Sequence, residues 1–570
     1  MAAQEQCPVS LSTLGPPRPG RRPLPTALLC LPIRRIIGPE EKAHLRLRVL
    51  DLLREEDSQI AVQLSVLLAK VARVDHPRDW PDLFDRLLGA MGAAAEDMLM
   101  TRRLYLTLHH VVKELASKRL AADQRAFEEL TQHILPPLWD RWGRESQDLL
   151  EHLPPALQTP ALAAQVRFKF ERWLFLLKML RRLVCFGFPS DARTLEDVPM
   201  VPQFVDAVLQ LLGAMLPLRP PRPDPRNQLL AMLDRGLLKL VKSVKDAQDT
   251  HPWSFRLGGS LARSLDFFGQ QVVSGPLVGE PVFSKFKIQC MLLLNQVLQC
   301  SQYRGSGNLK SSLGGMRIEA ERSEARDRID QLEQELLAGG LAQFLQPQCL
   351  GSIMAALVER YLPFREEDVT ELLEEPEQFH HDADRSSFEE QLRPCAETLY
   401  VSLLERDREG LGPFVVELLQ KSLQACPPGS ASSLPPGTPS VVGVPYPLLA
   451  KEAVYNAVGT GSYELHDFVD YTSWLQSALL LEIQDKSPVN TILRRRVAIL
   501  LGQFVAKLPD EARDSCYRVL VEMLSERGSI ALQLAALSSL RLLIDDWGFY
   551  EDQFGPYVGP TIQAAIQLLP

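Results

Sequence analysis

Residues 59–88 read QIAVQLSVLLAKVARVDHPRDWPDLFDRLL, and this stretch decides the fold. Its first half places apolar residues three or four positions apart, which is typical of one face of an α-helix. His76 and Pro77 then end that helix. Asp79 can cap a second amphipathic helix, with Pro81 in its first turn. Two such helices cannot bury both apolar faces alone, so the stretch predicts a stack of similar pairs.

The same pattern of paired amphipathic helices continues along the chain. We expect pairs at 98–115 with 123–139, 166–184 with 201–215, 448–458 with 463–480, 491–508 with 510–524, and 529–543 with 556–569. Further helices are expected between these pairs. No stretch alternates apolar and polar residues between turn signals, so we expect no β-sheet.

The composition is that of a folded protein outside membranes. Of the 570 residues, 46% are hydrophobic and 23% are charged. The longest apolar run, 173–188, is interrupted by Lys178, Arg181 and Arg182, and a membrane helix needs roughly 18 uninterrupted apolar residues. The first residues of the chain lack the basic start and apolar core of a secretory signal. We therefore expect no contact with a membrane.

Metal and cofactor sites find little support in the sequence. Nine cysteines are scattered without a Cys-x-x-Cys pair, which disfavours a zinc site and indicates reduced thiols in a cytosolic or nuclear protein. His380, His381, Asp382 and Asp384 offer possible metal ligands, but short clusters of this kind in charged loops are usually solvated. We predict no bound metal and no cofactor.

No combination of residues points to catalysis. Residues 305–311 resemble a phosphate-binding loop, but that motif requires glycine where this chain has Arg304 and Leu309, and no strand precedes it. The Gly-x-Ser-x-Gly and His-Glu-x-x-His motifs are absent. We predict that the chain is not an enzyme and has no catalytic residues.

The negative charge of the chain is concentrated in one segment. Residues 365–390 contain 11 acidic residues and two arginines, which equals the net charge of −9 for the whole chain. The remainder is balanced and lacks the basic stripe of a nucleic-acid-binding protein, so we expect no direct contact with nucleic acid. The segment instead predicts one local acidic surface.

Two Pro-rich segments mark the ends of the expected repeat regions. Residues 1–35 are rich in proline and arginine and predict a flexible arm. Residues 424–447, which include PPGSASSLPPGTP, predict a disordered loop. Helical repeats are expected at 36–140, at 141–423 and at 448–570.

Several motifs carry a resemblance to a known family. They are LLAKVARVDHPRDWPDLFDRLL at 67–88, LASKRLAADQ at 115–124, LRPCAETL at 392–399, KEAVYNAVG at 451–459, LRRRVAILLGQF at 493–504 and DDWGFYEDQFGPY at 545–557. In sequence and in order these motifs resemble nuclear transport receptors of the karyopherin-β (importin-β) superfamily. The resemblance extends from about Ile36 to the end of the chain.

The resemblance implies an all-α fold, a right-handed superhelical solenoid of HEAT-type helical hairpins. Residues 36–140 would correspond to what remains of the N-terminal, Ran-binding repeats, 141–423 to central repeats, and 448–570 to later ones. Compared with the family, the chain is expected to lack about one and a half repeats at its start and to stop within the array, since repeats have roughly 40 residues.

The resemblance also implies a function. A nuclear import receptor binds a folded protein cargo, contacts Phe-Gly nucleoporins while it crosses the pore, and releases cargo when it binds Ran-GTP. It shuttles between cytoplasm and nucleus. Receptors of this kind carry ubiquitin-conjugating enzymes and ribosomal proteins. Two alternatives stay open: a HEAT-repeat scaffold that acts without Ran, and a truncated isoform with impaired transport.

The candidate partner-binding site is the acidic segment. Its residues are Glu366, Glu367, Asp368, Glu371, Glu374, Glu375, Glu377, Asp382 and Asp384. The segment resembles acidic insertions with which several receptors of the family contact Ran or basic cargo. The alternative is a solvated loop without a partner.

Two further features concern the repeats themselves. Asp75, Pro77, Trp80 and Pro81 form a motif that we assign to packing and helix initiation, not to partner contact. Near residue 530 the family pattern places an aspartate and, four residues later, an arginine, which can form a ladder between repeats. This chain has Gly528 and Leu532 at those positions.

Overall fold

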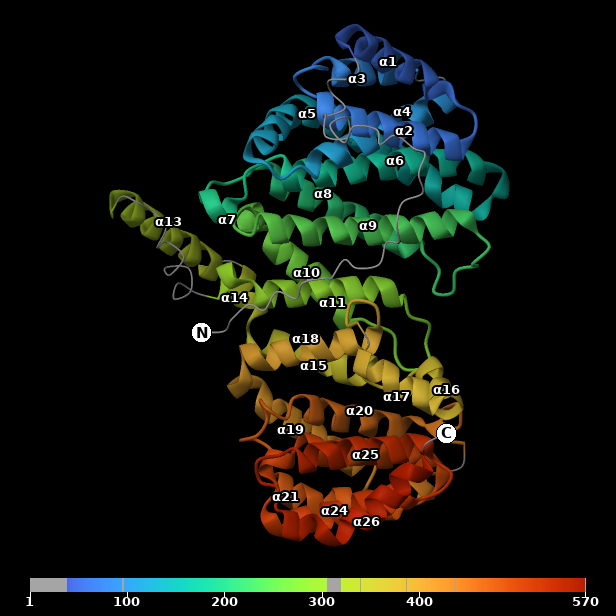
Figure 1. Cartoon of the computed structure of the whole chain (residues 1–570), viewed down its shortest axis with the longest axis vertical. Helices are drawn as coiled ribbons and strands as arrows, with labels where there is room; N and C mark the ends of the chain where they lie inside the picture. The colour runs from blue at the N-terminus through green and yellow to red at the C-terminus, as the bar shows by residue number, and fades with distance from the viewer. Residues whose placement is uncertain are drawn as a thin grey trace, which may run out of the picture. The chain divides into compact units, whose positions relative to one another are not determined.

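The computed structural model describes residues 38–94, 97–304, 319–338, 340–385, 387–435 and 437–568, and these are mostly helical (Figure 1). The predicted arm at 1–35 and the glycine-rich stretch at 305–311 lie outside the described residues. The chain divides into two compact units, residues 1–114 and 115–570, which are described separately.

The first unit contains four helices. They are α1 (Pro39–Asp51), α2 (Ser58–Asp75), α3 (Leu83–Ala93) and α4 (Met98–Ala116), which runs two residues past the boundary. The Asp57 carboxylate caps α2 by accepting hydrogen bonds from the first backbone N–H groups of that helix. Helix α2 contacts α1 and lies beside α4, where Ser65 Oγ and Thr107 Oγ1 are 2.9 Å apart. The Lys70 ammonium also lies 3.0 Å from the Glu114 carboxylate.

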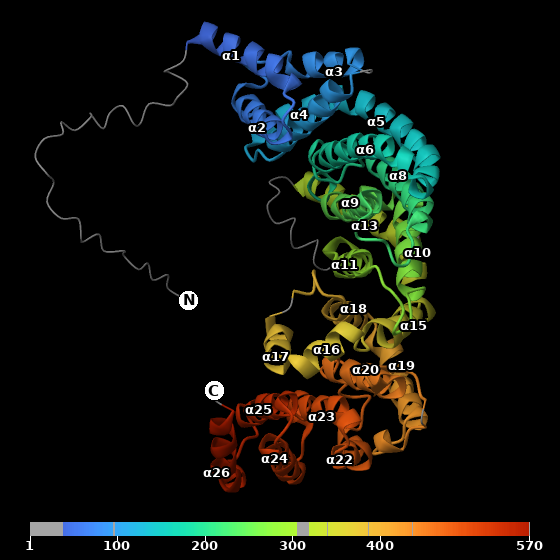
Figure 2. The same cartoon turned by 90° about the vertical axis from the view of Figure 1, so that its right-hand side faces the viewer.

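The second unit is built from two columns of helices (Figure 2). The first column contains α5 (Ala121–Gln158), α8 (Met200–Met215), α10 (Ser260–Val273), α15 (Pro347–Ala356), α19 (Arg408–Ala425), α24 (Asp510–Ser525) and α26 (Glu551–Gln567). The second column contains α6 (Pro160–Phe186), α9 (Gln228–Thr250), α11 (Ser284–Gln299), α18 (Leu392–Arg406), α20 (Tyr446–Thr460), α23 (Thr491–Gln503) and α25 (Ile530–Ile544). Each second-column helix contacts the next one in that column. The array is therefore a stack of antiparallel helical hairpins, and the predicted all-α repeat fold is confirmed.

Further helices lie outside the two columns. They are α7 (Asp191–Thr194), α13 (Glu319–Ala338), α14 (Gly340–Phe344), α16 (Glu366–Glu374), α17 (Pro376–Arg385), α21 (Tyr471–Trp474) and α22 (Leu480–Gln484). A π-helical turn at Leu475–Leu479 joins α21 to α22. Among the residues that the structure describes, one helical stretch, Met200–Leu218, is long and apolar enough to cross a membrane. It comprises α8 and the turn that follows, and its Phe204 and Leu212 are buried.

The predicted assignment of helices to hairpins is wrong, because it is shifted by one helix along the chain. Helix α6 packs chiefly on the preceding α5, whereas α8 packs on α9. At the other end of the unit, α24 pairs with α25, and in the first unit α1 contacts α2. A helix inside an array has neighbours on several sides, so its apolar face does not reveal whether its hairpin partner precedes or follows it.

Helix α5 is longer than predicted. We expected an end near residue 139, but the helix continues to Gln158 through Pro136, Pro137, Pro154 and Pro155. Proline removes a backbone donor and usually breaks a helix. Here the continuation carries buried aromatic and leucine side chains. The Trp142 and Trp173 rings stack at 6.4 Å, and the Trp173 indole N–H donates to Ser146 Oγ at 2.8 Å. Burial of this face outweighs the lost helical hydrogen bonds.

The prediction of a disordered loop at 424–447 is wrong for the residues that the structure describes. Cys426, Ala431, Val441 and Val444 are buried. Backbone N–H groups at positions 429 and 432 donate to the carboxylates of Glu482 and Asp485, at 3.1 and 3.0 Å. Two short antiparallel strands, β1 (Ser440–Val441) and β2 (Val444–Pro445), also correct the expectation of no sheet. Composition misled us because a few apolar side chains and two carboxylates suffice to hold this segment.

A network of buried charges joins three successive helices of the second column. The Glu452 carboxylate on α20 is fully buried. It accepts hydrogen bonds from Arg393 on α18, at 3.0 and 3.1 Å, and from Arg496 on α23, at 2.8 Å. Arg393 also lies 3.2 Å from Glu397, which in turn accepts a hydrogen bond from Asn456 on α20. We call Arg393, Glu452 and Arg496 the ionic ladder.

The electrostatics of the ladder depend on both arginines. Burial alone would raise the pKa of the Glu452 carboxyl, but the guanidinium groups of Arg393 and Arg496 outweigh burial and lower that pKa. A buried charge is tolerated only when it is paired and hydrogen-bonded. Gly528 and Leu532, in contrast, cannot form the ion pair that the family pattern places near residue 530.

Glu452→Gln keeps the shape of the side chain but removes the charge that Arg393 and Arg496 share, which leaves Arg496 without its ion-pair partner and Arg393 with Glu397. We expect the free energy of unfolding at pH 7 to fall by about 3–5 kcal/mol, measured by urea denaturation followed by circular dichroism. Glu417→Gln is the matched control, because the exposed Glu417 pairs only with Lys421 one turn away. This variant should change stability by less than about 1 kcal/mol. Equal effects of the two substitutions would contradict the role of the ladder.

The comparison of the wild type with Glu452→Gln also predicts a dependence of stability on pH. The pKa of Glu452 in the folded chain lies below its unfolded value of about 4.3. The ladder therefore stabilises the fold above that pH, and its contribution is lost as the pH falls through the folded pKa. The stability difference between the wild type and Glu452→Gln should shrink on acidification below about pH 4. A constant difference across this range would show that the charge of Glu452 is irrelevant.

Candidate partner-binding surfaces

The acidic segment is folded as two short helices, α16 and α17, inserted between α15 and α18. The segment is therefore helical and not a loop. The Asp368 carboxylate accepts the Arg365 backbone N–H at 2.8 Å and so caps α16. On the inner side of α16, Val369 and Leu372 are buried. The segment is therefore a structured insertion with one apolar side.

The acidic residues fall into two groups by exposure. Glu366, Glu367, Glu374, Glu375 and Glu377 are exposed, whereas Asp368, Glu371 and Asp382 are half-buried. The side chain of Asp384 lies outside the described residues. Burial raises the pKa of Asp368, and burial together with the nearby Asp382 and Asp368 carboxylates raises the pKa of Glu371. The exposed group forms the surface that a cationic partner could reach.

Helix α17 is anchored on the second column. The Phe379 ring meets Phe364 edge-on at 5.8 Å, and the Arg495 guanidinium lies over Phe379 at 5.2 Å. His380 Nε2 lies 3.1 Å from Ser538 Oγ on α25. The aromatic and histidine contacts hold the insertion against α23 and α25, so its acidic residues occupy a defined place on the repeats.

The described residues contain no group of three or more His, Cys, Asp and Glu side chains arranged to hold a metal. Of the four possible ligands, His380 instead contacts Ser538, and His381 lies 3.7 Å from its neighbour Asp382. His380 therefore serves in the contact with α25, whereas His381 is exposed.

The Asp75 motif organises the turn between α2 and α3. Asp75 is buried and accepts two hydrogen-bonded contacts from the Arg46 guanidinium, at 2.8 and 2.7 Å. Its backbone carbonyl accepts the N–H groups of Asp79 and Trp80, and the Trp80 ring is 4% exposed. The predicted helix start is wrong in detail: α3 begins at Leu83, after Pro81, and Asp79 does not cap it.

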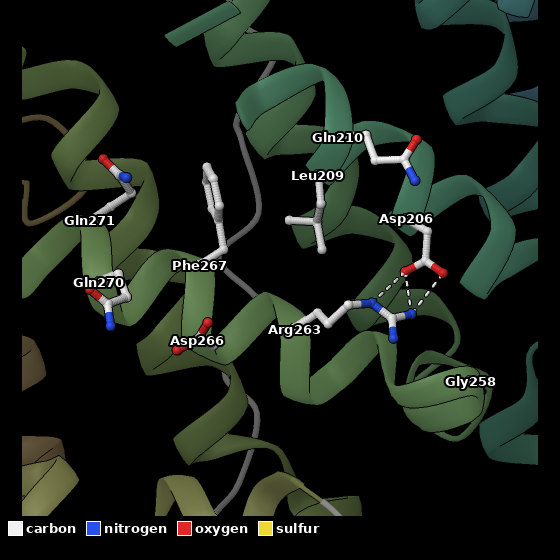
Figure 3. Close-up of a pocket in the computed structure, with 9 residues that line it drawn as sticks. All are labelled: Asp206, Leu209, Gln210, Gly258, Arg263, Asp266, Phe267, Gln270 and Gln271. Carbon is white, nitrogen blue, oxygen red and sulfur yellow. Dashed lines mark hydrogen bonds and ion pairs between the residues drawn. The ribbon is translucent and has the colours of Figure 1, made fainter. Parts of the chain in front are cut away.

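An open hollow of about 720 Å³ lies between α8 and α10 in the first column (Figure 3). Leu209 and Phe267 give it apolar walls. Gln210, Gln270 and Gln271 add side-chain amides to its lining. Asp206 and Arg263 form a bidentate ion pair at one end, with Arg263 Nη2 at 2.6 and 2.7 Å from the two carboxylate oxygens. The hollow suits a small apolar side chain whose backbone can hydrogen-bond to amides.

The sequence did not reveal the hollow or the ionic ladder as sites. The ladder residues stand inside the motifs at 392–399, 451–459 and 493–504, where charged residues interrupt apolar runs. A charged residue at an apolar position is the available signal for a buried ion pair. The hollow carries no such signal, because Leu209 and Phe267 look like ordinary core residues.

The comparisons with known proteins agree with the helical-repeat fold. No protein-family model matches the chain. Importin-11 from Mus musculus and from Homo sapiens are each 31% identical over 536 residues, which is 94% of this chain and 50% of importin-11. Importin beta-like protein KAP120 from Saccharomyces cerevisiae is 22% identical, covering 93% of this chain and 48% of KAP120. The chain thus spans about half the length of the curated relatives it matches.

Two solved structures share the fold. One is Lph2, a bidirectional nuclear transport receptor of S. cerevisiae, with a TM-score of 0.68, 20% identity, and coverage of 93% of this chain and 49% of Lph2. The other is the exportin Cse1 in its cargo-free state, with a TM-score of 0.57, 12% identity, and coverage of 95% and 50%. Receptors of the importin-β family are not enzymes, in agreement with the sequence-based expectation for this chain. Along 94% of its length, the chain is thus similar to about half of importin-11.

Proposed function

We propose that the chain acts in nuclear import as a receptor for folded protein cargo. The observation that carries this proposal is the 31% identity to importin-11 along 94% of the chain. The receptor shuttles between cytoplasm and nucleus and releases its cargo on binding Ran-GTP. Ubiquitin-conjugating enzymes and ribosomal proteins are the cargo classes that the family resemblance implies.

The acidic insertion supports a contact with Ran or with a basic cargo. Its exposed carboxylates are held on a structured support, because α17 is anchored to α23 and α25. A preformed surface loses less conformational entropy on binding than a flexible loop. Like charges packed along one helix pair repel one another, and a cationic partner relieves that repulsion. Such binding is strongest at low ionic strength.

One prediction from this proposal concerns the binding of Ran. In a pull-down with Ran locked in its GTP form, we expect binding that is absent with the GDP form. Glu366→Gln, Glu367→Gln, Glu374→Gln and Glu375→Gln combined should weaken it about tenfold, since each lost exposed charge pair contributes a few tenths of a kcal/mol. The control removes four exposed acids that lie outside residues 36–140 and outside the acidic insertion: Glu409→Gln, Glu417→Gln, Glu522→Gln and Glu551→Gln.

The outcomes separate the two claims. GTP-selective binding that survives the first set of substitutions would contradict the role of the acidic insertion only. No GTP-selective binding by a protein shown to be folded by circular dichroism would contradict import by Ran-driven release. The chain would then be a Ran-independent scaffold or an isoform with impaired transport.

The hollow between α8 and α10 supports a contact with Phe-Gly nucleoporins. A phenylalanine ring could pack between Leu209 and Phe267, and the glutamine amides could hydrogen-bond to the peptide backbone on either side. Contacts of this size are individually weak, which suits passage through a pore lined by many repeats.

A further prediction concerns the retention of the chain on immobilised Phe-Gly repeats. Phe267→Ala removes one wall of the hollow and should reduce retention several-fold, because an aromatic contact contributes about 0.5–1.5 kcal/mol beyond its buried area. Tyr463→Ala is the control, since Tyr463 is 83% exposed and lies outside the hollow. Equal retention of the two variants would contradict this assignment of the site.

A further inference from the structure

A compact cluster of positive charges lies on two adjacent helices of the second column. The residues are Lys178, Arg181 and Arg182 on α6, and Arg235, Lys239 and Lys242 on α9. We call these six residues the cationic patch. Helices α6 and α9 pack directly against each other, and both views place them side by side (Figures 1 and 2). The patch is separate from the acidic insertion, which packs on α23 and α25.

The helical periodicity brings these six side chains to one face. On α6 the buried residues Trp173, Leu177 and Leu180 face the core. The cations are at 178, 181 and 182, three and four residues apart, and so share another face of the helix. On α9 the cations are spaced by four and three residues, which places them on one stripe. The two helices approach closely, because a Cβ at Gly236 would lie 2.8 Å from the Phe170 ring. The two stripes therefore form one surface.

Two acidic side chains compensate part of this charge, since Glu171 acts on Lys178 and Asp246 acts on Arg182. Arg181 pairs with Asp246 on α9. Within the described part of the chain, no carboxylate lies within ion-pair distance of Lys178, Lys239 or Lys242. Burial and then neighbouring cations lower the pKa of Lys178 and of Lys239. The same two causes lower the pKa of Arg182. The cations therefore repel one another, and an anionic partner would relieve this repulsion.

The size of the patch limits the partner. At 1.5 Å per residue, residues 235–242 extend about 10 Å along α9, and neighbouring helix axes lie about 8–10 Å apart. This area matches three or four carboxylates of a short peptide run, at roughly 3.3 Å per extended residue. A nucleic acid would extend beyond the patch and meet a chain whose net charge is −9. The dimensions therefore favour a short acidic protein segment.

We propose that the cationic patch on α6 and α9 is a docking surface for an acidic segment of a partner protein. This surface is opposite in sign to the acidic insertion, so one second column offers two sites for segments of opposite charge. The proposal does not depend on transport, because it rests on the charge and geometry of these two helices.

The test uses fluorescence anisotropy with a labelled short polyglutamate peptide, and the full chain at low ionic strength. We expect polyglutamate to bind and a polyglutamine peptide of equal length not to bind. Lys239→Glu combined with Lys242→Glu should weaken binding at least about tenfold, equivalent to about 1.4 kcal/mol. Raising the ionic strength to about 0.3 M should also weaken it.

Controls keep the test decisive. Lys421→Glu with Arg518→Glu makes the same change of charge at exposed positions of the first column, on α19 and α24, and should alter affinity less than about twofold. Lys239→Gln with Lys242→Gln neutralises the two charges without reversing them and should give an intermediate loss of affinity. This variant replaces the double glutamate variant if the latter does not fold. Unchanged binding by both patch variants, or equal binding of polyglutamine, would overturn the proposal. Tighter binding of a short oligouridylate, lost in the same variants, would also overturn it by showing a polyphosphate site.

Discussion

Three helices of the second column, α18, α20 and α23, are linked by one buried carboxylate that two arginines share. Glu452 is fully buried, and the pair Arg393 and Arg496 supplies both its charge balance and its hydrogen bonds. Ion pairs at this depth add little net stability compared with apolar packing, but they are costly to break. The geometry of these hydrogen bonds also matters, because Glu452 reaches both arginines only when α18, α20 and α23 keep one register. The ladder therefore adds a charged link between neighbouring repeats to their apolar contacts and to hydrogen bonds such as that from Asn456 to Glu397.

Charge also organises the accessible surface of the same column. The acidic insertion is anchored near α25 through Phe379 and His380, and the cationic patch lies on α6 and α9. Repeats in a solenoid contact only their neighbours, so each helix can present its own charge without disturbing distant ones. The result is a scaffold whose core is apolar and internally paired, and whose exposed stripes differ in sign from one region to another.

The sequence predicted the fold class from the spacing of apolar residues, since stripes such as that of residues 59–74 require neighbours on both sides. It could not predict the pairing, because the apolar face of α6 looks the same whether α5 or α8 is its partner. The predicted end near residue 139 was wrong for α5, because buried Trp142 lies on a continuation of the same apolar face. The acidic residues were found by composition, whereas their anchor depends on Phe379 and Arg495, which meet only in space. The hollow at Phe267 likewise exists only through the packing of α8 and α10.

The most direct test of the ladder is hydrogen–deuterium exchange of the folded chain, comparing the wild type with Glu452→Gln peptide by peptide. If Glu452 couples three hairpins, α18, α20 and α23 will lose protection together, while α9, which lies outside the ladder, will keep its protection. Loss of protection confined to α20 would contradict the account, because it would show that each hairpin is stabilised by its own apolar contacts and that the shared carboxylate has only a local effect.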